Sequence, residues 1–265
     1  MAAAPSRLLF YDLVGHPGGP FYSPNTWKTR LSLLAKGVEF DEREVTYLEL
    51  REMAPRIGVE RPAVPLLEFP DGTFLSDSWA IAEWLDKTYP DQPSLFLPDA
   101  PTPVKLDSPE MTLAKNYALL FTAGFGDSDS MWSTFYELSA QGICDSMTDP
   151  AQKEYFTSDY KQGFKDAWKW LQSRNRGALL KHAKASVLPL NPVLAKTPFL
   201  AGHQPGFVDF IAYGRYHMMR SACPADCKAV WFRPDEIPHV GAWIERIEKR
   251  WEKELEGAMA RLPPM

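Results

Sequence analysis

The stretch 62–90 constrains the fold of this chain most strongly, because a strand, a tight turn, a second strand and a capped helix follow one another there. Ala63–Phe69 is a short apolar run of the kind that forms a buried strand. Pro-Asp-Gly at 70–72 is typical of a turn, and Thr73–Leu75 has the pattern of the returning strand. Residues 76–89 begin with capping side chains and continue with apolar residues at helical spacing.

Pro65 is an unusual residue for the first of these strands. Proline has no N–H to donate to a sheet, so it belongs at an edge or a bulge. A cis Val64–Pro65 bond would serve a different purpose, because it would turn the Val64 backbone outward toward a ligand. Only about 5–6% of X–Pro bonds in folded proteins are cis, so position alone favours the trans form.

Val64-Pro65 followed by Asp77-Ser78 resembles the closing half of the glutathione-binding domain of glutathione transferases. In that family the residue before a cis-proline pairs through its backbone with the cysteinyl part of glutathione. An acidic-Ser pair at the next helix start holds the γ-glutamyl end. The resemblance therefore implies a cis bond, and it gives cofactor-binding roles to Val64, Pro65, Asp77 and Ser78. The longer run 76–86 looks most like the lignin β-etherases and their fungal etherase-like (FuA) relatives.

The composition is that of a globular protein with a large core. The chain has 265 residues, of which 45% are hydrophobic and 13% aromatic, so one large or two modest domains are expected. A net charge of −5 argues against nucleic acid as a partner. No apolar stretch approaches the ~18 residues that a membrane span requires. The 3 cysteines and the absence of a signal-peptide pattern lead us to expect a cytoplasmic protein without a disulfide scaffold.

We expect an α/β domain followed by an all-helical one. The elements predicted before residue 90 follow the order β-α-β-α-β-β-α, which fits the thioredoxin-like fold that the resemblance implies. Their ranges are 8–14, 24–36, 38–47, 48–57, 63–69, 73–75 and 78–89. The expected division is a thioredoxin-like glutathione-binding domain (1–90), a proline-rich linker (91–109) and an all-helical substrate-binding domain (110–265).

Two apolar stripes at helical spacing mark the second half of the chain. One stripe consists of Phe156, Tyr160, Phe164, Ala167 and Leu171, and the other of Val240, Ile244, Ile247, Trp251 and Leu255. The segment 199–209 resembles the buried capping-box helix of the transferase second domain, with Gly206 where the family usually has Ser or Thr. We expect Asp209 to reach back to the free N–H at the start of that helix.

Ser23 is the predicted catalytic residue. Ser-Pro at 23–24 is a strong helix-start signature, so a purely structural cap is the alternative interpretation. In glutathione transferases the Tyr, Ser or Cys at this place contacts the glutathione sulfur, and Ser-Pro-x-x-Trp looks like the etherase-type subgroup. A helix N-terminus favours an anion, and a hydroxyl can donate a hydrogen bond to a thiolate. Asn25 is predicted to add a second donor.

The family has a cation for the glycyl carboxylate of glutathione in the region before the proline strand. Arg51, Arg56 and Arg61 lie there, and the sequence does not choose among them. An aromatic lining would suit a flat phenolic second substrate, although core packing is the alternative role for such side chains. The predicted substrate-binding residues are Phe21, Tyr22, Phe121 and Phe125.

Cys223 and Cys227 are separated by three residues rather than the two of a common redox or zinc pair, and no second ligand pair is visible. We therefore predict no metal.

The resemblance implies a glutathione transferase that uses glutathione as cosubstrate, acts on electrophilic aromatic compounds in detoxification, and in the etherase-type case cleaves β-aryl ethers of lignin-type phenolics. A non-catalytic carrier for phenolic or apolar small molecules is the alternative. A thiol-disulfide reductase on the same fold is disfavoured by Ser23, which stands where a reductase needs Cys. The resemblance also implies a homodimer, and neither nucleic acid nor membrane is an expected partner.

Overall fold

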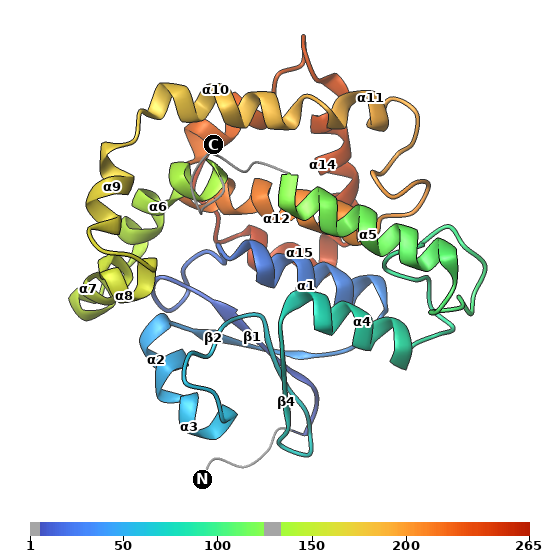
Figure 1. The fold of residues 1–265 in the computed structure, drawn as a ribbon, viewed down its shortest axis with the longest axis horizontal. Coiled ribbons are helices and arrows are strands. Elements are labelled where there is room, and N and C mark those ends of the chain that lie inside the picture. The colour runs from blue at the N-terminus through green and yellow to red at the C-terminus, as the bar shows by residue number, and fades with distance from the viewer. Residues whose placement is uncertain (1–5, 125–133) are drawn as a thin grey trace.

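The computed structural model describes residues 6–124 and 134–265, and its N-terminal part is built on a four-stranded mixed sheet (Figure 1). The strands are β1 (Leu9–Leu13), β2 (Asp41–Val45), β3 (Leu66–Glu68) and β4 (Phe74–Ser76), in the order β2-β1-β3-β4. β1 pairs with β2 in parallel and with β3 antiparallel, and β3 and β4 form an antiparallel pair. The predicted α/β thioredoxin-like fold of this part is confirmed.

Helices cover both faces of the sheet because β1 is apolar on both sides. Successive side chains of a strand point to opposite faces. Phe10 therefore packs into the main core with α1 (Pro24–Ala35) and α4 (Ser78–Thr88), whereas Tyr11 packs on the side of α2 (Tyr47–Glu52) and α3 (Ala54–Ile57). In Figure 1, α1 and α4 lie between the sheet and the helical region.

The helix predicted over 48–57 is in fact two short helices. Thr46 and Glu49 form a reciprocal capping box at the start of α2. Pro55 has no N–H for the hydrogen bond that a continuous helix would need, and α3 begins anew with this proline in its first turn. Gly58, with φ of 79°, ends α3 in the left-handed conformation.

The rest of the described chain is helical, which confirms the predicted all-α character of the C-terminal part. The helices are α5 (Pro109–Gly124), α6 (Thr134–Ser146), α7 (Pro150–Thr157), α8 (Asp159–Gln162), α9 (Ala167–Ser173), α10 (Arg176–Val187), α11 (Leu190–Leu194), α12 (Phe207–Ala222), α13 (Pro224–Trp231), α14 (Pro238–Arg250) and α15 (Glu252–Met259). None of the helices formed by the described residues is long and apolar enough to cross a membrane. The predicted domain limits at residues 90 and 110 remain a prediction.

Both apolar stripes of the second half are divided between successive helices. Ser158 has an extended backbone and caps α8, and Gly163 ends α8 with φ of 98°, so the first stripe is shared by α7, α8 and α9. Trp251 leaves the helical conformation and separates α14 from α15. Phe156, Ala167 and Leu171 of the first stripe are buried, whereas Tyr160 on α8 is 41% exposed, so the predicted apolar face is not continuous.

Helix α12 joins the two parts of the molecule. Most of its residues are buried, and it packs against α1 and α6. A Cβ atom on Gly214 would lie 2.4 Å from the backbone oxygen of Pro24, so only glycine allows α12 to approach the start of α1 this closely. The N-terminus of α1 is thereby held against the helical region.

Asp209 caps α12 as expected and also does more. The Gly206 N–H donates to its Oδ2 at 3.0 Å, which is the predicted reach-back contact. The buried carboxylate also accepts from the backbone N–H groups of Leu200 (2.7 Å) and Ala201 (3.1 Å) and from Nε1 of Trp243 (2.8 Å). Burial raises the pKa of Asp209 to about 6, and these donors act in the opposite direction. One carboxylate thus ties the 199–202 loop and α14 to the start of α12.

Candidate functional site

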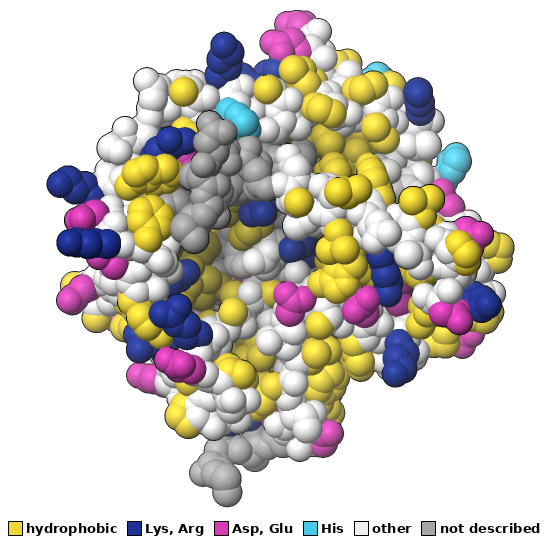
Figure 2. Space-filling model, viewed as in Figure 1, with side chains coloured by type: hydrophobic (Ala, Val, Ile, Leu, Met, Phe, Trp, Pro, Cys, Tyr) yellow, Lys and Arg dark blue, Asp and Glu magenta, His cyan; other side chains and the backbone are white. Residues whose placement is uncertain are grey.

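A cavity of about 520 Å³ lies where the two parts of the chain meet. Its walls come from the loop between β1 and α1, from α2, from the residues before β3, and from α6, α7, α8 and α12. Figure 2 shows a hollow near the middle of this face of the molecule, with Lys and Arg side chains along part of its rim. Four predicted site residues line the cavity, namely Tyr22, Ser23, Asn25 and Val64.

Ser23 occupies the N-cap position of α1 and is only 7% exposed. Its Oγ accepts from the Thr26 N–H at 3.4 Å, which is long for a cap, and the Thr26 hydroxyl donates to the Ser23 carbonyl at 2.9 Å. In the contacts of the described residues this oxygen acts only as an acceptor. The Ser23 proton is therefore available to a group in the cavity, so the capping role and the catalytic role are compatible.

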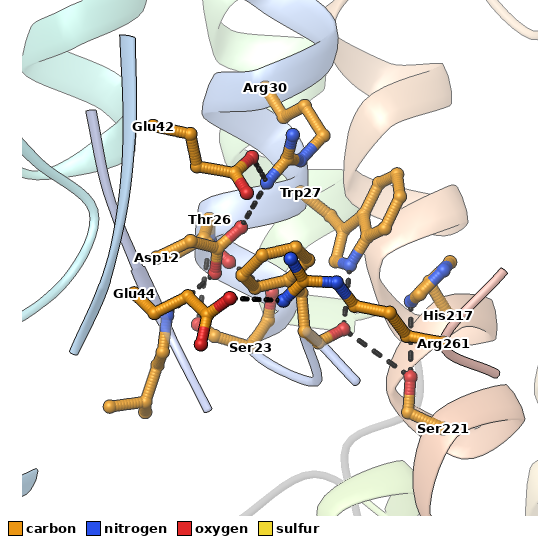
Figure 3. A network of polar contacts seen from close by, with 12 residues as sticks. Asp12, Ser23, Thr26, Trp27, Arg30, Glu42, Glu44, His217, Ser221 and Arg261 are labelled. Carbon is orange, nitrogen blue, oxygen red and sulfur yellow. Dashed lines mark hydrogen bonds and ion pairs between the residues drawn. The ribbon is translucent and has the colours of Figure 1, made fainter. Parts of the chain in front are cut away.

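Contacts from both parts of the chain fix the backbone just before Ser23. Trp27 donates from Nε1 to the Phe21 carbonyl at 2.9 Å, and the Ser221 hydroxyl donates to the same oxygen at 3.3 Å (Figure 3). His217 contacts Ser221 through Nδ1 at 3.2 Å, and its ring stacks on Trp27 with 3.6 Å between ring centroids. Burial holds the pKa of His217 well below its ordinary value. The neutral imidazole of His217 thus helps to hold the loop before Ser23 in place through Ser221 and Trp27.

Phe21 itself lies outside the cavity lining. Its ring is buried between two guanidinium groups, with Cζ of Arg30 at 4.8 Å and Cζ of Arg261 at 4.5 Å from the ring centroid. Arg30 is anchored in turn by ion pairs with the buried Asp12, at 2.9 Å, and with Glu42 (Figure 3). The predicted substrate-binding side chain is therefore placed in the support beneath the loop.

The proline strand begins at the edge of the cavity. The Val64–Pro65 bond is cis, as the resemblance implies, and Val64 lines the cavity while Pro65 is buried behind it. Asp77 caps α4, accepting at Oδ1 from the N–H groups of Trp79 (2.9 Å) and Ala80 (3.0 Å). Its φ of 78° is a strained conformation for a residue with a side chain. Such strain is concentrated at functional sites.

Asp77 and Ser78 are not part of the cavity lining, but charged side chains link them to it. Half-buried Lys28 on α1 lies close to Asp77 and to the cavity residue Arg215. Burial, together with the charge of Arg215, lowers the pKa of Lys28 to about 8, and the Asp77 carboxylate opposes this shift. Ser78 is the first residue of α4 and is almost fully buried.

The three arginines before the proline strand fall into two groups. Arg56 forms an ion pair with the buried Glu68, which also accepts the Tyr11 hydroxyl proton at 2.5 Å. Arg51 and Arg61 line the cavity instead. The sequence did not distinguish these three arginines. The structure separates them, because Arg51 and Arg61 line the cavity whereas Arg56 pairs with a residue of the sheet.

Much of the cavity wall was not predicted. The additional polar and aromatic lining residues are Tyr47, Tyr136, Tyr155, Tyr160, Lys161 and Arg215. Phe121 is half-buried on α5 and does not line this cavity, and Phe125 lies outside the described residues. Tyr160 was noted in the sequence as part of an apolar stripe, but helical spacing alone does not show whether such a side chain lines a cavity or packs in the core.

The three cysteines are not among the residues that line the cavity. Cys144, Cys223 and Cys227 are free thiols, and burial raises the pKa of each. The described part of the chain contains no group of three or more His, Cys, Asp or Glu side chains placed to hold a metal ion.

The mixed sheet, the cis-proline strand beside the start of α1 and the appended helices define the fold of glutathione transferases. Residues 22–88 match the family model for the glutathione S-transferase N-terminal domain.

The solved structures that the whole chain resembles include two fungal glutathione transferases. One is a glutathione S-transferase of Ceriporiopsis subvermispora in complex with glutathione, with 23% identity, a TM-score of 0.69, and coverage of 92% of this chain and 97% of that one. The other is a FuA-type transferase of Phanerochaete chrysosporium, with 20% identity, a TM-score of 0.70, and coverage of 91% and 96%.

Proposed function

We propose that this protein is a glutathione transferase that binds glutathione in the cavity with the sulfur at Ser23. The observation that carries the proposal is the Ser23 hydroxyl, which lies at the N-terminus of α1, lines the cavity and has a proton to donate. The similar Ceriporiopsis protein was solved with glutathione, which supports the same ligand here.

In this proposal glutathione lies along the N-terminal domain. The Val64 backbone pairs with its cysteinyl residue, and Asp77 and Ser78 hold its γ-glutamyl end. Arg51 and Arg61 bind its glycyl carboxylate. The charges of the cavity support this arrangement, because several Lys and Arg side chains line it and Glu60 is the one acidic residue among the described lining. Glutathione carries two carboxylates and a thiolate, so a cationic site favours it.

The proposed chemistry is nucleophilic attack by the glutathione thiolate on an electrophilic carbon of an aromatic substrate. Ser23 donates to the thiolate, the dipole of α1 adds positive potential, and Asn25 supplies a further donor. In the β-aryl ether case a C–S bond forms as the C–O bond breaks, and the aryloxide leaves with the bonding electrons and takes a proton from water.

Thiolate stabilisation supplies only part of the rate. A thiol of pKa ~8.5 is about 3% ionised at pH 7, and lowering its pKa to ~6.5 raises this to about 75%. The roughly 25-fold gain in thiolate is offset by a roughly 8-fold loss of nucleophilicity over two units. The net gain is about 3-fold, so positioning of the second substrate against the sulfur has to supply most of the acceleration.

The β-aryl ether activity is tested by product release from a fluorogenic β-aryl ether with and without glutathione. The tyrosines of the cavity suit a flat phenolic substrate, and the resemblance of residues 76–86 to the lignin β-etherases favours an ether substrate over other electrophiles. We expect release only with glutathione. A rise in melting temperature with glutathione but no release would reject the ether substrate and keep the glutathione site. Tight competitive binding of phenolics with negligible turnover of any electrophile would favour the carrier function.

Asp77→Asn is expected to weaken glutathione binding by roughly tenfold, because it removes a charge-assisted partner of the γ-glutamyl ammonium. Asparagine tolerates positive φ and can cap a helix, so the free energy of unfolding should change little. Calorimetric titration with glutathione measures the first effect and urea unfolding the second. Asp71→Asn is a matched control, because Asp71 is also an exposed carboxylate that accepts a local backbone N–H. Equal affinities of Asp77→Asn and wild type would remove Asp77 from the proposed site.

We also propose that α5 forms a homodimer interface. Its outer face exposes Leu113 (71%), Tyr117 (46%) and Leu120 (74%), and neighbouring exposed apolar side chains of this kind mark protein–protein contacts. Leu120→Glu is expected to convert a dimer to a monomer, since it would bury a charge in the interface. Light scattering after size-exclusion chromatography measures the mass. Leu188→Glu, at an exposed leucine just after α10, is the control and should remain dimeric. A monomeric wild type would contradict the proposal.

A further inference from the structure

Lys161 on α8 lies in the wall of the cavity and has no counter-ion in the described part of the chain. Its ammonium lies 4.8 Å from the ring centroid of Tyr47, and its side chain is half-buried. Within residues 6–124 and 134–265 it forms no ion pair. Burial lowers the pKa of Lys161, since it removes water from the charged group. An anion brought into the cavity would therefore be stabilised beside it.

Tyr22 supplies an unused hydrogen-bond donor to the same cavity. It is only 3% exposed, and among the described residues its hydroxyl makes no hydrogen bond of good geometry, although the Tyr47 phenol lies beside it. Leaving such a buried group unpaired is unfavourable, so an unpaired hydroxyl in a cavity wall indicates a ligand atom. Burial is the main cause of the raised pKa of Tyr22, and the neighbouring Tyr47 phenol adds to it. Tyr22 and Lys161 thus both lie next to Tyr47.

This pair of donors is distinct from the arginines assigned to glutathione. Arg61 stacks over Tyr160, with Cζ 3.9 Å from the ring centroid, and Arg51 contacts the same ring at 5.2 Å. Lys161 packs on Tyr47 instead. Lys161 is therefore a cavity cation outside the Arg51–Arg61 pair, and glutathione needs only that pair for its glycyl carboxylate.

Apolar side chains line the same cavity as Lys161 and Tyr22. Leu13 is the last residue of β1, Ile143 comes from α6 and Met218 from α12, and all three line the cavity with Tyr22 and Lys161. An apolar surface with a few polar groups at its border is the usual form of a small-molecule site. The lining therefore fits a ligand with a flat apolar body and an anionic end.

We propose that the second substrate is an aromatic carboxylate, whose ring packs on Leu13, Ile143 and Met218 and whose carboxylate accepts hydrogen bonds from Lys161 and Tyr22. This inference rests on the proposed function and names the substrate class of that same cavity. A neutral aromatic would fill the apolar part but leave both donors unpaired. A phenolate offers one oxygen, whereas a carboxylate offers two oxygens to the two donors.

The test is calorimetric titration of naphthalene-2-carboxylate and of its neutral isostere naphthalene-2-carboxamide into the protein, with glutathione titrated first to saturation. Bound glutathione would occupy Arg51 and Arg61, so these arginines would not contribute to the difference in affinity between the carboxylate and the amide. The carboxylate should bind roughly tenfold or more tightly than the amide, because hydrogen bonds to a charged group are the strong ones. Lys161→Met should abolish this preference. Lys169→Met, an exposed lysine on α9 that does not line the cavity, should retain it.

Tyr22→Phe should weaken carboxylate binding severalfold and amide binding less. Equal affinities of the two ligands in the wild type, or a preference that survives Lys161→Met, would overturn the inference, as would tighter binding of naphthalen-2-ol than of the carboxylate. If glutathione itself produces neither binding heat nor a rise in melting temperature, the proposed function fails. The carboxylate titration without glutathione then still decides whether Lys161 forms an anion site.

Discussion

Ser23→Ala is expected to lower kcat/KM at pH 7 by roughly 10- to 100-fold, because a hydrogen bond to a charged group contributes about 1.5–3 kcal/mol. Loss of thiolate accounts for about 3-fold of this, and loss of sulfur positioning accounts for the rest. Glutathione affinity should change little, since the anchors at Asp77, Ser78 and the Val64 backbone remain. Steady-state kinetics across pH separate the two parts. The ionisation part should vanish at alkaline pH, where the thiol of bound glutathione ionises without help.

Two further variants separate catalysis from capping at this position. Alanine at an N-cap costs about 0.5–2 kcal/mol of stability, whereas glycine costs only a few tenths, and the 3.4 Å cap contact places Ser23 at the lower end. Ser23→Gly should therefore lose turnover as Ser23→Ala does while keeping nearly the wild-type stability. Ser23→Thr keeps a hydroxyl and should retain much of the activity. Unchanged turnover in both the Ala and the Gly variant would leave Ser23 as a structural cap.

Asp209→Ala is expected to lower the free energy of unfolding by about 4 kcal/mol or more, because it leaves several buried N–H donors without an acceptor. These donors lie in the 199–202 loop, at the start of α12 and on α14, so one substitution loosens three segments. For a chain of this size the melting temperature should fall by roughly 10 °C.

Urea unfolding monitored by circular dichroism measures the Asp209 effect. Asp209→Asn should not restore the lost stability. Its amide nitrogen cannot accept a hydrogen bond from the N–H groups on that side, and only its one oxygen could accept. Asp235→Ala, at a carboxylate with no described contact in a turn before α14, is the control and should unfold with the wild type. A midpoint for Asp209→Ala within error of the wild type would show that water replaces the carboxylate without loss.

Local sequence patterns were sufficient to predict the backbone segments on which the candidate site is built. Ser23-Pro24 is a cap followed by a proline, and the strand, turn and cap between 63 and 78 lie next to one another along the chain, so their geometry depends on neighbouring residues. The order of the strands within the sheet was not predicted, because no pattern in a single sequence shows which strands pair.

The residues of the cavity wall could not be predicted in the same way. Tyr136, Tyr155 and Lys161 belong to different helices, and they meet the N-terminal domain only because α7 packs on α2, where the Tyr47 N–H donates to Gln152 at 3.2 Å. No local periodicity encodes that contact.

Phe21 and Tyr22 show why neighbouring residues near Ser23 were hard to separate. In the loop they are adjacent, and both were expected to face the substrate. The structure places Tyr22 in the cavity and Phe21 between Arg30 and Arg261. Adjacent side chains of a non-helical segment commonly point to opposite sides, and the side that faces the cavity is decided by the packing of α12.

The most direct test of the central claim is the pKa of the glutathione thiol when bound, measured from the ultraviolet absorbance of the thiolate in a pH titration of wild type and Ser23→Ala. Ser23 and the N-terminus of α1 are proposed to stabilise the anion, so the bound thiol in the wild type should titrate roughly one to two units below the ~8.5 of a free thiol. In Ser23→Ala the pKa should return most of the way toward the free value. A bound thiol that titrates like free glutathione, or identically in the two proteins, would contradict the assignment of Ser23 to the sulfur.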